Sequence, residues 1–195
     1  MIGWMAGDRA RVQAMATCDA VAPRSSAADW TARATARCWA VILAHGIDVT
    51  AHRAALACGG RTVAVLACGP DLAYPREHAG LLDDIATHDA VVSEYPPGTP
   101  PARHRFLARN RVIAALARGT LVVEAARRSG TIVTALRASE LGRPVMAVPG
   151  PVTSAMSAGC QVLIRAGEAV LVTDAAEAAS SLPPGLAGDD GLQSG

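Results

Sequence analysis

Short runs of hydrophobic residues alternate with amphipathic segments between residues 38 and 172. The runs predict six buried strands, and the segments between them have the spacing of helices about ten residues long. Strands that are hydrophobic on both faces lie between two helix layers, and strand–helix alternation is typical of β-α-β units. The pattern therefore predicts an α/β protein with a Rossmann-like, doubly wound, mostly parallel sheet.

The pattern also divides the chain into three parts. Residues 1–37 show no clear period, so we expect an irregular or degenerate N-terminal segment. Residues 38–180 form the predicted Rossmann-like domain, and the Gly-, Pro- and Asp-rich residues 181–195 are expected to be a disordered tail. The predicted strands are 39–43, 62–66, 90–93, 120–123, 144–148 and 169–172, and the predicted helices are 47–57, 80–87, 106–118, 132–141 and 160–166.

Composition narrows the class of protein. The chain has 195 residues, of which 51% are hydrophobic and 18% charged, which fits a globular domain and excludes a disordered chain. The net charge of +1 gives no global field toward nucleic acid or membrane, and no hydrophobic run is long enough to span a bilayer. Five scattered cysteines without a C-x-x-C pair, and no secretory signal, predict reduced thiols in the cytoplasm.

Several ligand motifs are missing from the sequence. A G-x-G-x-x-G turn, a P-loop, an H-E-x-x-H zinc motif and a G-x-S-x-G elbow are all absent. We therefore expect no dinucleotide, no metal and no other cofactor.

The basic residues are unevenly placed. All 18 of them are arginines, and nine lie between Arg103 and Arg143 together with only two acids. The only Phe, Phe106, shares a helical face with Asn110, and Arg109 lies beside them. A ring among guanidinium groups suits a nucleic-acid base stacked above its phosphate backbone. The spacing allows equally that Phe106 anchors the core and that the arginines form a solvated face.

A second candidate follows the strand at 120–123. Arg127 and Arg128 precede Ser129-Gly130-Thr131, which open a predicted helix. Free amide groups at a helix start, with two hydroxyl groups, can hold an anion. The same residues also suit an ordinary helix cap.

A third candidate is the pair Asp48 and His52, four residues apart on one helix. An Asp–His pair could serve catalysis, but no nucleophile is placed near it by the sequence. We favour the structural interpretation, in which Asp48 caps the helix and His52 packs under the sheet edge.

Six motifs occur in a fixed order along the chain, and together they resemble a known family. They read HGIDVTAHRAAL, TVAVLACGPDLAYP, VVSEYPPGTPP, FLARNRVIAALARGTLVVEA, SGTIVTALRASELGRPVMAVPGP and SAGCQVLIRAG. Their order strongly resembles that of the DprA (Smf) DNA-processing family over about two thirds of the chain. The resemblance implies a dimeric, non-enzymatic, cytoplasmic protein of transformation and recombination. Such a protein binds and protects single-stranded DNA, loads the RecA recombinase onto it, and does not associate with membranes.

The resemblance also implies where DNA would bind. It assigns Phe106, Arg109, Asn110 and Arg111 to the DNA pocket, lined also by Ser129 and Gly130. With the analysis of the residues above, it leads us to expect that Arg109, Arg111 and Arg53 neutralise phosphates and that Phe106 stacks on a base. The backbone amides of Ser129 to Thr131 are expected to hold a phosphate.

Two segments depart from the family pattern. The family has an earlier strand that ends in a Gly-Ser/Thr-Arg phosphate loop, whereas residues 20–26 here read AVAPRSS. The Ser-Gly-rich loop before Gly46 is replaced by Leu43-Ala44-His45. We therefore expect that one strand is lost or replaced, and that the C-terminal winged-helix-like domain of many members is absent.

Two alternatives remain at this point. One is a Rossmann-like enzyme similar to nucleoside monophosphate phosphoribohydrolases, with Glu94 or Glu124 as its acid, although the Pro-Gly-Gly-x-Gly-Thr loop of those enzymes is not present. The other is an inactive, truncated family member whose exposed sheet edge lowers its solubility.

Overall fold

The computed structural model describes residues 41–42, 47–57 and 60–183. Its strands form two parallel three-stranded sheets with the orders β1-β2-β3 and β4-β5-β6. The strands are β1 (Val41–Ile42), β2 (Val63–Leu66), β3 (Ala90–Ser93), β4 (Thr120–Val122), β5 (Val145–Ala147) and β6 (Val170–Leu171).

Helices connect these strands and cover both faces of the sheets. They are α2 (Ile47–Ala57), the 3-10 turn η1 (Arg76–His78), α3 (Ala79–His88), α4 (Arg103–Leu116), α5 (Gly130–Glu140), α6 (Ala158–Arg165) and α7 (Ala175–Ser180). Strand–helix alternation with parallel pairing confirms the predicted α/β, Rossmann-like class.

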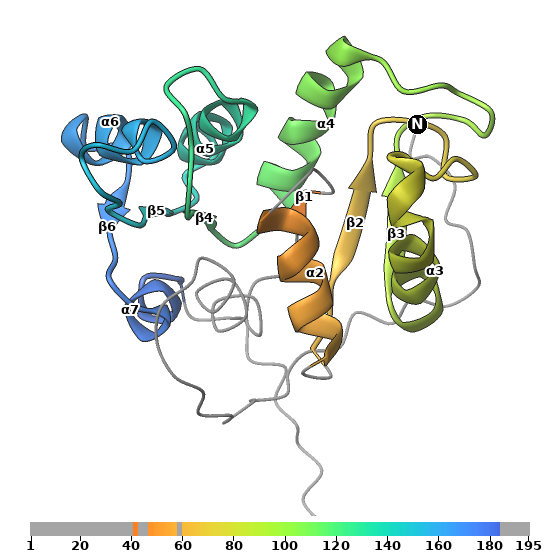
Figure 1. Ribbon diagram of the computed structural model, residues 1–195, viewed down its shortest axis with the longest axis horizontal. Coiled ribbons are helices and arrows are strands. Elements are labelled where there is room, and N and C mark those ends of the chain that lie inside the picture. The colour runs from red at the N-terminus through yellow and green to blue at the C-terminus, as the bar shows by residue number, and fades with distance from the viewer. Residues whose placement is uncertain (1–40, 43–46, 58–59, 184–195) are drawn as a thin grey trace, which may run out of the picture.

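The two sheets lie side by side, and their strands follow the spatial order of a doubly wound fold. Figure 1 shows the strands across the molecule as β6, β5, β4, β1, β2 and β3. Among the described residues no hydrogen-bonded pairing joins β1 to β4, so the expected continuous sheet is divided in two. Residues 15–30, where a further strand would have to lie, are outside the described part of the chain.

The first sheet is covered on one face by α2 and α3. Ala64 and Leu66 of β2 alternate toward this face and pack against Val49 of α2 and Ile85 of α3. The intervening Val65 is also buried, on the other side of the strand, where α4 contacts β2. Alternation of side chains along a strand therefore gives the first sheet two buried faces.

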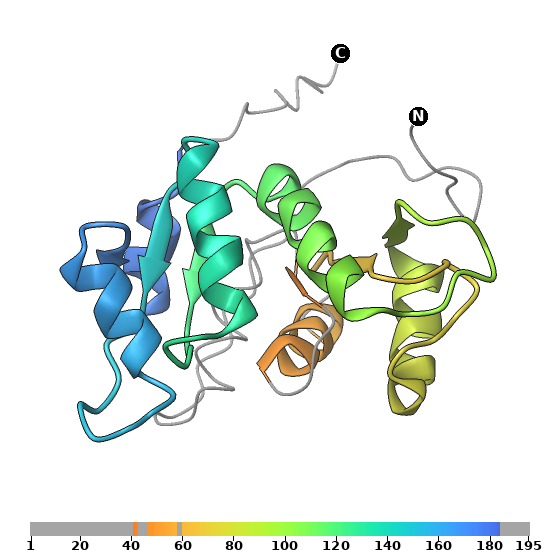
Figure 2. The ribbon, with the colours of Figure 1, turned by 90° about the horizontal axis from the view of Figure 1, so that it is seen from above.

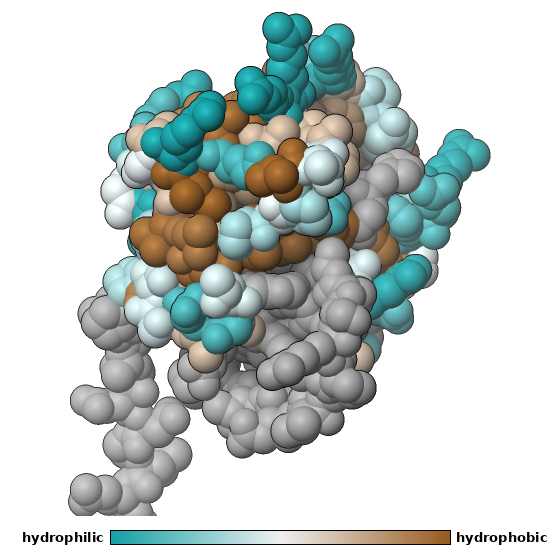
Figure 3. All heavy atoms as spheres, turned by 60° about the vertical axis from the view of Figure 1, so that its left-hand side comes forward, coloured by the Kyte–Doolittle hydropathy of each residue, from teal (hydrophilic) through white to brown (hydrophobic). Residues whose placement is uncertain are grey.

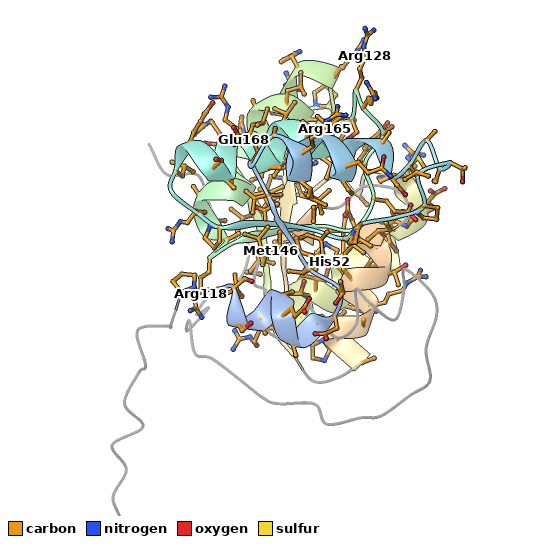
Figure 4. All side chains as sticks on the ribbon, turned by 90° about the vertical axis from the view of Figure 1, so that its left-hand side faces the viewer. His52, Arg118, Arg128, Met146, Arg165 and Glu168 are labelled. Carbon is orange, nitrogen blue, oxygen red and sulfur yellow. The ribbon has the colours of Figure 1, made fainter. Side chains whose placement is uncertain are left out.

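The second sheet has the same arrangement. Val145 and Ala147 of β5 join a core with residues of α5 and α6, whereas Met146 between them packs toward Val172 and Ala178. Figure 4 shows Met146 in the layer between α6 above and α7 below. Both faces of β5 are therefore buried, as its unbroken hydrophobic run predicts.

Helix α4 joins the two halves. It packs against α5 and also against β2 and β1. Figure 2 shows it passing between α5 on one side and the elements of the first sheet on the other. The first turn of α4 and the β4–α5 loop thereby meet near the carboxyl end of β4. In doubly wound folds, ligands bind beside the point where the strand order reverses.

Three elements show the largest differences from the sequence prediction. Helix α4 begins at Arg103, three residues before the predicted start, and its N-cap residue Ala102 makes no side-chain cap. The turn η1 and helix α7 were not predicted. The sequence does contain a signal for α7, since the Asp174 carboxylate accepts a hydrogen bond from the Glu177 amide and Glu177 accepts one from the Thr173 amide. The first bond is that of an N-cap, and the second resembles a capping box except that Glu177 bonds the amide one residue before the N-cap.

The predicted segments at the chain ends fall mostly outside the described residues. Residues 1–40, including the irregular segment 1–37, are not described, and neither are residues 184–195 of the predicted tail. Within the described ranges, every helix is too short or too polar to cross a lipid bilayer.

Candidate nucleic-acid interface

An open depression of about 510 Å³ lies between the first turn of α4 and the start of α5. Helix α4 contributes one wall, and the β4–α5 loop with the first residues of α5 contributes the other. Its lining residues are Arg103, Phe106, Leu107, Arg127, Arg128, Ser129, Gly130, Ile132 and Val133. The depression therefore brings together two of the segments that the sequence singled out separately.

Phe106 lies at the α4 wall and is half-buried. The Arg109 guanidinium carbon is 5.6 Å from the centre of its ring, within the range of a cation–π contact. The Tyr74 ring is 5.8 Å away and tilted by 57°. The ring is therefore fixed by a cation and an aromatic neighbour while it still borders the depression. Neither the core-anchor interpretation nor the stacking interpretation describes it alone.

Three exposed arginines surround the depression. Arg103 comes from α4, and Arg127 and Arg128 come from the β4–α5 loop. Figure 4 shows Arg128 pointing away from the ribbon into open space. The described residues place no carboxylate within ion-pair distance of any of the three. The rim of the depression thus carries positive charge that is available to an anion.

The first residues of α5 line the side of the depression that faces α4. Ser129 is the N-cap residue, but its side chain makes no capping hydrogen bond, and its buried Oγ has no partner among the described residues. The space around Gly130 is open, with the Asn110 amide nitrogen as the nearest atom at 3.8 Å from the position of an added Cβ. Thr131 follows in the first turn and is half-buried. The ordinary cap is therefore not formed, and the amide groups of this turn lie beside the positive rim.

Arg109 lies in the interior instead of on the surface. It is 4% exposed, its Nη1 donates to the Val65 carbonyl oxygen at 2.6 Å, and its Nε donates to Asn110 Oδ1 at 3.3 Å. Burial lowers the pKa of this guanidinium to about 10, which the nearby Asp48 carboxyl partly opposes. The position differs from the expected exposed phosphate contact, because the side chain turns from α4 toward the end of β2.

Asn110 is also buried, with 5% of its surface exposed. Its Nδ2 donates to the Gly130 carbonyl oxygen at 3.3 Å, and this bond joins α4 to the start of α5. The side chain thus holds the two walls of the depression together instead of facing the solvent.

The two remaining predicted arginines lie apart from the depression. Arg111 is exposed and forms an ion pair with Glu94 at 2.5 Å. Arg53 lines a different hollow with Glu77 and Asp84, on the side of the first sheet covered by α2 and α3. The structure therefore does not gather these two charges with the other candidate residues.

The Asp48–His52 pair is not a catalytic dyad in this structure. His52 is fully buried, and its Nδ1 shares a hydrogen bond of 2.7 Å with Thr62 Oγ1. Burial lowers the pKa of His52 to about 4 and raises that of Asp48 to about 7, although the Arg109 charge opposes the shift of Asp48. The core interpretation of His52 is confirmed. No group of three metal-binding side chains occurs among the described residues.

Sequence analysis did not single out Arg103 or Tyr74 as site residues and treated Arg127 and Arg128 only as added charge. The basic residues follow one another closely, so the sequence could have suggested them. Tyr74 had no such signal, because it reaches Phe106 only through the fold.

Comparison with known proteins assigns the chain to a family. A family model described as DNA recombination-mediator protein A matches residues 24–183. The DNA processing protein DprA of Streptococcus pneumoniae is 50% identical over 131 residues, which are 67% of this chain and 46% of that protein. Protein Smf of Escherichia coli is 47% identical over 145 residues, which are 74% of this chain and 38% of that protein.

Solved structures agree with the family match. The crystal structure of the Streptococcus pneumoniae protein superposes with a TM-score of 0.76 at 39% identity, covering 84% of this chain and 59% of the other. DNA processing protein A from Helicobacter pylori, whose structure concerns its single-stranded DNA binding mode, gives a TM-score of 0.71 at 24% identity. That match covers 80% of this chain and 73% of the other, and it supports the fold.

The chain spans about half the length, or less, of these curated relatives. The family model, in contrast, covers most of the chain described here. The order of the motifs, the doubly wound arrangement and the matches agree, and the chain belongs to the DNA recombination-mediator protein A family, that of DprA and Smf.

Proposed function

We propose that the depression between α4 and α5 binds single-stranded DNA without cleaving it. The observation that carries this proposal is the half-buried Phe106 ring beside three exposed arginines that have no described acidic partner. A ring offers a stacking surface to any base, and guanidinium groups neutralise phosphates irrespective of sequence. The family membership and the DNA binding of the Helicobacter pylori relative support the same function.

The candidate residues take different roles in this proposal. Phe106 stacks on a base, while Arg103, Arg127 and Arg128 neutralise phosphates. Amide groups from Ser129 to Thr131 bind a phosphate oxygen at the positive end of α5. These are the groups that border the depression or follow it in the first turn.

The buried residues support this surface. Arg109 holds the Phe106 ring, and Asn110 joins α4 to Gly130. Arg111 and Arg53 add long-range positive charge at the edges of the path, with Arg111 partly neutralised by Glu94. Residues that were expected to contact DNA thus act in this account by positioning those that do.

A salt titration tests the proposal. The logarithm of the affinity for a labelled oligodeoxynucleotide should fall against the logarithm of the salt concentration by about 0.7 for each neutralised phosphate. Arg128→Ala should lower the affinity for all sequences alike and reduce the slope by about 0.7. The matched control is Arg165→Ala on α6, an exposed arginine outside the depression, which should leave both quantities unchanged.

Two results would count against the proposal. The first is an affinity that does not depend on salt, or no binding of single strands at all. The second is release of free base from a nucleotide, measured by chromatography, which would favour the phosphoribohydrolase-like alternative. We expect that DNA is recovered intact after incubation.

We further propose that two copies of the chain associate through the β6 edge. Val170 and Leu171 on this edge strand are 58% and 46% exposed. Figure 3 shows hydrophobic residues gathered in a band across the face that carries α6, β6 and α7. An exposed hydrophobic edge strand favours association with another chain. Light scattering after size exclusion should give twice the monomer mass, and Val170→Asp should return the monomer.

The wider role follows from the family and is part of the same proposal. We expect that the protein protects incoming single strands in the cytoplasm during transformation and loads RecA onto them for recombination. Stimulation of RecA filament assembly on protein-coated single strands tests this role. A chain that binds DNA but does not stimulate assembly would contradict it.

A further inference from the structure

We propose that Tyr74 forms a second base-stacking position next to Phe106, so that the DNA path continues from the depression across the first turn of α4 to the loop after β2. This inference rests on the proposed function and extends it to a residue outside the depression. Two neighbouring bases would then stack on two neighbouring rings.

The two rings come from different elements of the fold. Phe106 lies on α4 and borders the depression, whereas Tyr74 lies in the loop between β2 and η1 and does not line it. Their ring centres are 5.8 Å apart. Figure 2 shows α4 between α5 and the first sheet, so a strand that leaves the depression on the side away from α5 crosses α4 toward this loop.

The spacing of the rings suits consecutive bases of one strand. Stacked bases of a strand are about 3.4 Å apart, and they separate further when the strand is extended. The tilt of 57° means that the two rings do not share one plane. A strand would therefore have to bend between the two bases, as a single strand can and a duplex cannot do without deformation.

Tyr74 is also accessible. It is 45% exposed, which places it among the large hydrophobic side chains that the fold leaves at the surface. A tyrosine at the surface beside a phenylalanine offers ring area at little cost in side-chain entropy, since it has only two side-chain torsions. Arg103, which borders the depression, lies on the same helix turn as Phe106 and adds positive charge to this end of α4.

The other tyrosine is less suited to this role. Tyr95 is half-buried, and the Arg105 guanidinium carbon lies 5.2 Å from its ring centre. Phe106 has an arginine over its ring in the same way, but among the described residues Tyr95 makes no ring contact with Phe106, whereas Tyr74 does. Because the chain has only two tyrosines, Tyr95 gives a matched control for the removal of a ring.

The test combines ring removal with base removal. Affinities are measured for a set of single-stranded oligonucleotides that each carry one abasic site, moved along the strand one position at a time. In the unaltered protein two adjacent abasic positions should weaken binding, each by about tenfold. In Tyr74→Leu one of these two positions should become silent, while the other should keep its effect through Phe106.

Further variants complete the design. Tyr74→Leu should bind the unmodified strand about tenfold more weakly, with an unchanged salt slope because no charge is removed. Tyr74→Phe should keep full affinity, and Tyr95→Leu should keep both abasic effects. Circular dichroism melting of each variant confirms that the domain is folded.

The possible outcomes separate this inference from the proposed function. If the unaltered protein does not bind single strands, the proposed function fails. If it binds but Tyr74→Leu weakens every abasic oligonucleotide equally, Tyr74 only supports the Phe106 ring and the second stacking position is refuted. Unchanged affinity in Tyr74→Leu refutes it as well and leaves the proposed function standing.

Discussion

Replacement of Asp48 by Asn should change the pH dependence of stability in a way that the structure defines. Burial raises the pKa of Asp48 from 3.8 to about 7, against the opposing charge of Arg109. The folded protein therefore holds a proton that the unfolded chain releases between these pH values. Stability from this group is present at low pH and is lost as the pH rises through about 7.

His52 acts in the opposite direction. Burial lowers its pKa from 6.5 to about 4, so the unfolded chain binds a proton in this interval that the folded protein excludes. Stability from His52 is present above about pH 6.5 and is lost as the pH falls toward 4. Between these values the two groups oppose each other, and their joint contribution to the slope is close to zero.

The magnitude follows from the two shifts. One pKa unit corresponds to about 1.4 kcal/mol, so the free energy of unfolding of Asp48→Asn should rise relative to the unaltered protein by at most about 4 kcal/mol between pH 4 and pH 7. His52 then acts alone in the variant, and its contribution to the slope approaches about 1.4 kcal/mol per pH unit near pH 5 to 6. The substitution can also change the free energy of unfolding by the same amount at every pH, and such a constant change does not alter either slope.

Urea unfolding, followed by circular dichroism at steps of about half a pH unit, measures the difference. The control is Asp83→Asn on α3, which makes the same change of carboxylate to amide at an exposed position. A difference for Asp48→Asn that does not change with pH would refute the argument, because Asp48 would then be ionised in the folded protein throughout the range.

Three other perturbations test the remaining contacts. Arg109→Met should lower the free energy of unfolding by about 1–3 kcal/mol, because the Val65 carbonyl oxygen loses its buried donor. Unchanged urea stability with weaker DNA binding would instead place Arg109 at the DNA. Met146→Ala should lower the free energy of unfolding by about 2–5 kcal/mol in the same assay, since this β5 side chain is fully buried against Val172 and Ala178 of α7 and its preceding segment. A loss below about 1 kcal/mol would contradict this packing. Glu94→Gln should free Arg111 from its ion pair and raise the affinity for single strands, with a rise of up to about 0.7 in the salt slope. An unchanged affinity and slope would show that Arg111 is too far from the DNA.

The strands and most helices could be predicted from the sequence because each is defined by a local period. Helix α2 and strand β3 have the predicted bounds, and the other predicted elements in the described part differ by one to three residues at an end. Helix ends are less certain, because a helix can gain a turn without a cap when tertiary contacts hold it, as at Arg103. The N-cap of α7 is likewise a local signal, since Asp174 and Glu177 have the spacing of a capped helix start.

The composition of the candidate site was also accessible from the sequence. The only Phe, the dense arginines and the Ser-Gly-Thr helix start all indicated an aromatic surface with an anion site, and the order of the motifs resembled the family that the comparisons then established. These signals depend on residue type and spacing along one segment. The chain alone determines them.

Which of these side chains face outward was decided by the fold. Arg109 and Arg103 have the same chemistry and lie six residues apart on one helix, yet one is bonded to the end of β2 and the other borders the depression. A helix that packs against α5 and against the first sheet at once buries more of its surface than an amphipathic pattern predicts. Tyr74 and Phe106 are separated in the sequence by η1, α3 and β3. Only the packing of α4 against the loop after β2 could therefore bring the two rings together.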